Sequence, residues 1–393
     1  MAFLTSLGSK GSDSSKAPVG ERILNTNPVL EAFGNSRTAR NNNSSRFGKY
    51  TKMYFDVSDG MVMGAEIKNY LLEKSRVTGS TDKERNYHIY FFMIRGCDED
   101  VAKRLDFLKP DKSRKSFPDF KYLSKCNDLP VEKDVKEYKE LMDAFSTLGF
   151  TKGEVDAIHS ITAASLHIGE LELDVKTYNE GKTPVSIKNK DKLKQIASFL
   201  GIQSPEDLEV EIVNKEAMQG FGRTPAKPDA VGDAVKSLAK ALYNNMFDWL
   251  VAKMNVEILP DDIKSREPAA VQEFGLKTRT IGLLDIFGFE NFELNQFEQL
   301  CINFVNEKLH NLYICSVFGS EKKEMEREQL EITLKLPDMK VTRVLLLMNS
   351  KKAPLGLFQN VDDKSGGGLG TDDKDKRVQE LYNVITKTHD PTK

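Results

Sequence analysis

Two stretches of the chain place apolar residues at three- and four-residue intervals, which is the pattern of an amphipathic helix. The first lies within residues 131–173, where Tyr138 and Leu141 share a face, and the second runs from Val235 to Met254. Alternating polar and apolar residues with several aromatics over Phe47–Val57 predict strands instead. The chain therefore combines long helices with strands, which indicates an α/β protein.

The segment before the predicted strands combines a helix with a polar loop. Asn27 followed by Pro28 is typical of a helix start and Gly34 of a helix end, so we expect a short helix over residues 27–34. Six consecutive polar side chains follow, from Asn41 to Arg46. This polar loop therefore lies between two fixed elements.

The polar loop carries side chains suited to a phosphate and its metal ion. Ser44 and Ser45 are small hydroxyl ligands of the kind that magnesium and phosphate accept, and Arg46 is a permanent cation beside them. Taken alone, the loop is equally consistent with a solvated turn. The case for a functional site strengthens only when a second segment is considered with it.

That second segment is a strand that ends in an acid. The sequence TRTIGLLD predicts a buried-type strand over residues 278–285, followed by a turn at Gly288 and a long helix from Asn295. Such a strand would fix Asp285 at the sheet edge where ligands bind in open α/β folds. Asp285 could then orient a magnesium-bound water, and Gly288 could offer its amide to a terminal phosphate. The alternative is an ordinary glycine turn, which this motif alone favours.

The two segments together predict a pair of switches that close on a terminal phosphate. Arg46 ends the first segment and Glu290 follows the glycine turn of the second, so the two side chains carry opposite charges. We expect them to form an ion pair when both segments close.

Composition narrows the function classes. With 57 basic and 59 acidic residues the net charge is -2, so no global basic field indicates nucleic-acid or anionic membrane binding. No run approaches the ~20 apolar residues of a membrane span, and we expect a soluble chain. The five histidines are scattered, and each is expected to be structural or exposed. The cysteines show no metal-binding spacing and indicate a reduced intracellular protein; they are Cys97, Cys126, Cys301 and Cys315.

Two motifs carry a resemblance to a known family. NPVLEAFGNSRTARNNNSSRFGKY, residues 27–50, resembles the switch I segment of myosins, and LLDIFGFENFELNQFEQLCINFVNEKLH, residues 283–310, resembles myosin switch II running into the relay helix. Weaker resemblance extends the match to roughly residues 21–320. Kinesins place SSRSH and DLAGSE at the corresponding points, whereas this chain has SSRFGK and DIFGFE. The resemblance implies part of a myosin heavy chain motor (head) domain, a P-loop NTPase-type α/β fold that is largely helical around a central mixed sheet.

The resemblance also implies a role for each matching residue toward ATP and Mg²⁺. Asn41 would contact the nucleotide phosphates, Ser44 would help to place the attacking water, and Ser45 would ligate the magnesium ion. Asp285 would hold a water bound to that ion, and Gly288 would sense the γ-phosphate. Arg46 and Glu290 would form the salt bridge that closes the site. By family, the partner is the actin filament and the location is cytoplasmic, in association with the cytoskeleton.

A division into four parts follows from the same resemblance. Residues 1–20 are expected to form a flexible leader, and residues 21–258 the upper actin-cleft subdomain with switch I. Residues 259–320 would hold the switch II strand and the relay helix. Residues 321–393 would form part of the lower actin-cleft subdomain.

The sequence departs from the family pattern in one important respect. No G-x-x-x-x-G-K-[S/T] phosphate-binding loop occurs in it, so we expect no ATPase activity from this chain alone. The later converter and neck are also missing, so no light-chain binding is expected. Two alternatives stay open: a non-catalytic actin-binding or regulatory protein, and a truncated gene product.

Overall fold

The computed structural model describes residues 4–5, 17–81, 83–123, 129–180, 182–216, 222–264, 268–293, 295, 297–330, 343–351 and 356–360. The chain divides into two compact units, Met1–Ile286 and Phe287–Lys393. Each unit is described below by itself.

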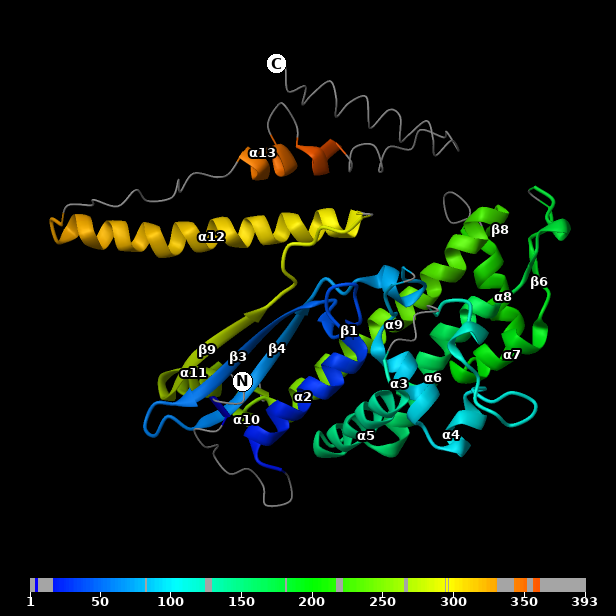
Figure 1. The fold of residues 1–393 in the computed structure, drawn as a ribbon, viewed down its shortest axis with the longest axis horizontal. Coiled ribbons are helices and arrows are strands. Elements are labelled where there is room, and N and C mark those ends of the chain that lie inside the picture. The colour runs from blue at the N-terminus through cyan, green and yellow to red at the C-terminus, as the bar shows by residue number, and fades with distance from the viewer. Residues whose placement is uncertain are drawn as a thin grey trace, which may run out of the picture. The chain divides into compact units, whose positions relative to one another are not determined.

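The first unit is largely helical. Its helices are α2 (Val19–Gly34), α3 (His88–Gly96), α4 (Glu99–Arg104), α5 (Val131–Thr147), α6 (Lys152–His167), α7 (Lys190–Phe199), α8 (Pro205–Val213), α9 (Pro228–Ile258), α10 (Asp261–Lys264) and α11 (Pro268–Lys277). Its strands are β1 (Asn35–Ser36), β2 (Ser44–Ser45), β3 (Gly48–Asp56), β4 (Val62–Tyr70), β5 (Leu173–Asp174), β6 (Ser186–Ile187), β7 (Asn214–Glu216), β8 (Arg223–Pro225) and β9 (Thr278–Asp285). In Figure 1, β3, β4 and β9 lie together on one side of this unit, and α3 to α8 gather on the other.

The central sheet has the strand order β4-β3-β9, and β1 and β2 form a short separate hairpin. Both pairings of β3 are antiparallel: Gly48 lies opposite Tyr70 of β4, and Lys49 lies opposite Asp285 of β9. The largely helical α/β fold is thus confirmed. The described strands pair only in antiparallel fashion, whereas a mixed sheet was expected.

Helices α2 and α9 form the core beside the sheet. Both contact β4 and each other, and Figure 1 shows them running next to that strand. Phe33 of α2 and Tyr243 of α9 are buried, and the Tyr243 hydroxyl donates to the Phe33 carbonyl at 2.8 Å. The Tyr87 ring stacks on Tyr243 with centroids 4.9 Å apart. This aromatic core fixes the end of α2, after which the chain passes through β1 into the polar loop.

Helix α2 begins earlier than the sequence predicts. It starts at Val19 and contains Pro28 inside, where a start at Asn27 was expected. Val19 and Ile23 are buried and extend the apolar face of the helix toward the N-terminus, so packing outweighs the missing proline N–H. The predicted end at Gly34 is confirmed.

Two strand predictions need correction. The sequence YLLEKSRV, residues 70–77, predicts a strand, but only Tyr70 belongs to one: Leu71 has a positive φ of 53° and a 3₁₀ helix, η1, follows at Lys74–Val77. Strand β9 has the predicted bounds, yet only Thr278 is buried in it, where a buried strand was expected. Within the described residues, β9 pairs with β3 alone, so no described strand pairs with its second edge.

The second unit contains helix α12 (Phe297–Arg327) and helix α13 (Arg343–Asn349). The long helix predicted from Asn295 is confirmed, and it continues through the charged run after Ser320. The sequence KRVQELYNVITKTHD, residues 376–390, predicts a further helix, and the Gly-, Asp- and Lys-rich residues 361–376 predict a loop; both segments lie outside the described residues. Across the described part of the chain, no helix is long and apolar enough to cross a membrane.

Candidate functional site

Both predicted switch segments reach the same end of the central sheet. The polar loop leads directly into the first residues of β3, and β9 ends at Asp285 opposite Lys49 in the antiparallel ladder. The Lys49 ammonium lies 3.3 Å from the Asp285 carboxylate, whose side chain is 56% exposed. Residues more than 230 positions apart in sequence are therefore brought to one edge by strand register.

The polar loop is shaped by its own asparagines. The Asn41 side chain accepts a hydrogen bond from the Asn43 backbone N–H at 2.9 Å, and the Asn41 N–H donates to the Thr38 hydroxyl at 3.2 Å. Such local bonds are typical of asparagine turns. Asn41, predicted to contact phosphate, is exposed and holds the turn with its side-chain oxygen.

Asn43 anchors the loop to three different elements. Its side-chain oxygen accepts from the Asn35 amide at 3.1 Å, and its amide donates to the Glu31 carboxylate at 2.9 Å. The same oxygen lies 3.1 Å from His88 Nε2, which must carry the proton of this hydrogen bond. Burial, assisted by the nearby Arg85 charge, lowers the pKa of His88 to about 3 and keeps the ring neutral.

A small cavity adjoins this anchor. Its volume is about 40 Å³, which suits a few water molecules. Its polar lining includes Asn43, His88, Glu31 and Lys133.

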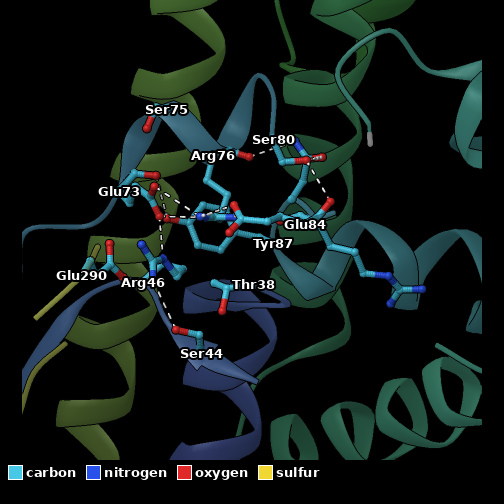
Figure 2. Close-up of polar contacts among 12 residues, drawn as sticks. Thr38, Ser44, Arg46, Glu73, Ser75, Arg76, Ser80, Glu84, Tyr87 and Glu290 are labelled. Carbon is cyan, nitrogen blue, oxygen red and sulfur yellow. Dashed lines mark hydrogen bonds and ion pairs between the residues drawn. The ribbon is translucent and has the colours of Figure 1, made fainter. Parts of the chain in front are cut away.

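Arg46 is the most deeply buried residue of the predicted site, with 0% of its surface exposed. Its Nε donates to the Glu73 carboxylate at 2.6 Å, and its Nη1 donates to the Ser44 hydroxyl at 3.2 Å. The main chain is tied as well, because the Arg46 N–H donates to the Gly34 carbonyl at 2.7 Å. Figure 2 shows the Arg46 guanidinium directed at Glu73, with Ser44 on its other side.

Glu73 is shared by two arginines. Arg76 Nε donates to the same Glu73 oxygen at 2.7 Å, and Arg76 also pairs with Glu84 at 3.2 Å. Burial alone would raise the pKa of Glu73, but the Arg76 and Arg46 charges outweigh it and hold that pKa below its usual value. Glu73 is therefore a carboxylate at neutral pH. The result is a buried chain of alternating charges, Arg46–Glu73–Arg76–Glu84, visible in Figure 2.

The remaining predicted residues, Gly288 and Glu290, belong to the second unit. There the Glu290 backbone N–H donates to the Asn303 side chain at 2.8 Å, and the Gln299 amide lies 3.4 Å from the Glu290 carboxylate. Helix α12 thus holds Glu290 from two positions one turn apart. The predicted pair between Arg46 and Glu290 would join the two units and stays a prediction.

Comparison with known proteins identifies the family. A family model of the myosin head (motor domain) matches residues 1–391. The chain belongs to the myosin head family. It is 37% identical over 359 residues to a myosin-I heavy chain of Dictyostelium discoideum, which covers 90% of this chain and 14% of that relative. It is 36% identical over 367 residues to Myosin-1 of Pyricularia oryzae, covering 92% of this chain and 28% of that one. The chain thus spans less than a third of the length of these relatives.

Magnesium, implied by the myosin head family, prefers oxygen ligands. The described part of the chain contains no group of three or more His, Cys, Asp or Glu side chains that could hold a metal ion. The end of the sheet where β3 begins and β9 ends at Asp285 is called the switch end below. It does offer the hydroxyls of Ser44 and Ser45 and the accessible carboxylate of Asp285. These few oxygens fit an ion that draws its other ligands from water and substrate phosphates, which is the usual manner of magnesium.

One feature of this myosin head was missed at the level of sequence. Glu73 lies in YLLEKSRV, residues 70–77, whose strand-like sequence gives it no role, although it directly contacts Arg46. His88 was expected to be structural or exposed, and it is a buried structural residue that holds the loop through Asn43. The Glu73–Arg76 spacing signals a local ion pair. Nothing in the spacing links Glu73 to Arg46, which lies 27 positions away.

Proposed function

We propose that the switch end of the central sheet is the phosphate-sensing part of a magnesium-dependent, actin-activated ATPase. The observation that carries the proposal is the ladder position of Asp285 opposite Lys49. This register brings the polar loop and the acidic end of β9 to one end of the sheet, which is the arrangement that two phosphate-sensing switches require.

Each site residue then has a distinct task. Ser45 and Asp285 would hold the magnesium ion, Asp285 through a water molecule, and that ion would neutralise the phosphate charge. Asn41 would contact the phosphates, and Ser44 would help to place the attacking water. Gly288 would offer its backbone N–H to the γ-phosphate.

Closure of the site would depend on the pairing of Arg46 with Glu290. A charge-assisted pair between a guanidinium and a carboxylate is both strong and directional. Its formation would exclude bulk water behind the phosphate and couple the site to α12, which holds Glu290. The partner for such a motor is the actin filament, which places the protein with the cytoskeleton.

A hybrid motor tests this function. In it, residues 21–320 replace the matching segment of the Dictyostelium myosin-I heavy chain, so that all other parts of the motor are supplied by the relative. We expect actin-activated ATPase activity from the hybrid motor. Asp285→Asn should lower that activity at least tenfold. Asp56→Asn provides the matched control, because Asp56 ends β3 opposite Thr278, at the far end of the same strand pair.

Equal losses from Asp285→Asn and Asp56→Asn would overturn the assignment of the switch end. A hybrid motor that binds actin filaments without hydrolysing ATP would instead support the alternative, a non-catalytic actin-binding or regulatory protein.

A further inference from the structure

The Arg46 guanidinium depends on Glu73 for its charge balance. Arg46 has no exposed surface, and its side chain keeps its positive charge at every physiological pH. A buried cation needs a hydrogen-bonded anion, because its hydration has been lost. Glu73, with 8% of its side chain exposed, supplies that anion at 2.6 Å.

Glu73 is itself held from several directions. Arg76 donates to both carboxylate oxygens, to Oε2 at 2.7 Å and to Oε1 at 3.3 Å. The Glu73 backbone N–H donates to the Arg46 carbonyl at 2.9 Å, and the Tyr87 hydroxyl donates to the Glu73 carbonyl at 2.8 Å. A carboxylate with so many fixed contacts provides a rigid support for the guanidinium.

Through Arg46, the support that Glu73 provides extends to the polar loop. Arg46 Nη1 donates to the Ser44 hydroxyl at 3.2 Å, and this hydrogen bond fixes the position of the Ser44 oxygen relative to the guanidinium. Loss of Glu73 would therefore displace both a cation and a hydroxyl of the switch end, although Glu73 itself lies outside the polar loop.

We propose that Glu73 is a positioning residue, which holds Arg46 and through it Ser44 in the orientation that the closing switch meets. This proposal deepens the proposed function and rests on it for its catalytic consequence. Its structural content stands alone: the hydrogen bond from Arg46 Nε to the Glu73 carboxylate fixes the orientation of the Arg46 guanidinium.

The full 393-residue chain, labelled with ¹⁵N-arginine, tests the structural content without nucleotide. The Arg46 Nε–H should give a slowly exchanging resonance, because it is buried and bonded to Glu73. Arg46→Lys removes this resonance and so assigns it. Glu73→Gln should accelerate its hydrogen exchange at least tenfold. Glu84→Gln is the matched control, since the Glu84 side chain is as buried as that of Glu73 and pairs with Arg76 in the same network.

Two results would overturn the positioning role. One is an Arg46 resonance that exchanges equally slowly in Glu73→Gln, and the other is equal acceleration in Glu73→Gln and Glu84→Gln. Circular dichroism verifies that each variant is folded. If Glu73→Gln does not fold, Glu73→Asp provides the same comparison, because it keeps the charge and shortens the reach to Arg46.

The hybrid motor tests the catalytic consequence. Glu73→Gln should lower kcat at least tenfold with little change in the KM for ATP, and Glu73→Asp should recover part of the loss. Glu84→Gln should change kcat less than threefold. A rise in KM without a fall in kcat would contradict the positioning role. An inactive hybrid motor without any substitution would contradict the proposed function instead, and the arginine resonance would still decide the role of Glu73.

Discussion

Asp285 and Lys49 face each other across the β3–β9 ladder, with their charged groups 3.3 Å apart. The pair lies where the polar loop and the acidic end of β9 come together. Because the Asp285 side chain is more than half exposed, the ion pair itself contributes little to stability. Its importance lies in the register, since a slip of one residue would turn Asp285 to the opposite face of the sheet.

The first prediction concerns nucleotide binding by the chain alone. The sequence contains no G-x-x-x-x-G-K-[S/T] loop, so the backbone amides and the lysine that usually cradle the β- and γ-phosphates are lacking. We expect Mg-ATP binding much weaker than a Kd of about 1 μM, measured by titration calorimetry. Affinity near 1 μM would mean that other residues replace the phosphate loop.

The second prediction concerns Asn43. Replacing it with alanine removes three side-chain hydrogen bonds and leaves buried groups of Asn35 and His88 without their partner. We expect a loss of about 1–3 kcal/mol of unfolding free energy and faster amide exchange over residues 38–46. Asn42→Ala is the control, because Asn42 is exposed and bonds only the Arg37 side chain in the described structure. Its cost should stay below about 0.5 kcal/mol.

The contribution of the sequence is clearest where the pattern is local. The end of α2 at Gly34, the strand β3 and the long helices α9 and α12 can be predicted from the sequence. The signals for them, a helix-ending glycine and apolar residues at strand or helix spacing, lie within each segment. The start of α2 could not be read in the same way, since Pro28 is a strong local signal and only tertiary packing of Val19 and Ile23 outweighs it.

The candidate site shows the same limit. Ser44, Ser45 and Asp285 could be chosen as candidates from the sequence, because hydroxyls in a loop and an acid after a strand are visible in it. Glu73 could not, because its contact with Arg46 arises when the residues after β4 return to the polar loop. Arg46→Glu would set a second carboxylate against Glu73 in a buried position, so exchanging the charges of Arg46 and Glu290 should not restore function.

The third prediction concerns acid. Burial lowers the pKa of His88 to about 3 and the pKa values of His159 and His167 to about 4, from an ordinary 6.5. Between pH 6.5 and 4 the unfolded chain therefore binds more protons than the folded chain, so stability is full above pH 6.5 and falls as pH falls. The slope is up to about 1.4 kcal/mol per pH unit for each proton. Urea titrations at pH 7.5, 6 and 5 measure it.

A histidine pair separates this effect from general acid sensitivity. His159→Gln should reduce the slope, whereas His310→Gln should not, because His310 is exposed on α12. A slope unchanged by His159→Gln would show that other groups control acid unfolding.

The fourth prediction concerns the exposed strand β9. Ile281 and Leu284 are 41% and 52% exposed, beside a strand edge that has no described partner. Exposed apolar edge strands are sites of association. We expect the purified chain to bind an apolar dye and to associate at high concentration, and Leu284→Glu to reduce both. Leu276→Glu on α11 is the control for adding a charge at an exposed leucine outside β9. A monomeric, dye-free wild-type chain would contradict this account of β9.

The most direct test of the two-switch account is a double-mutant cycle on Arg46 and Glu290 in the hybrid motor. Arg46→Lys, Glu290→Gln and the double variant are compared for ATP affinity and for the hydrolysis rate in single turnovers. If the two residues pair as the site closes, each single change leaves ATP affinity nearly intact and slows hydrolysis, and the double variant shows a coupling energy of roughly 1–3 kcal/mol. Additive losses in the hydrolysis rate, together with weakened ATP binding in both single variants, would contradict the account.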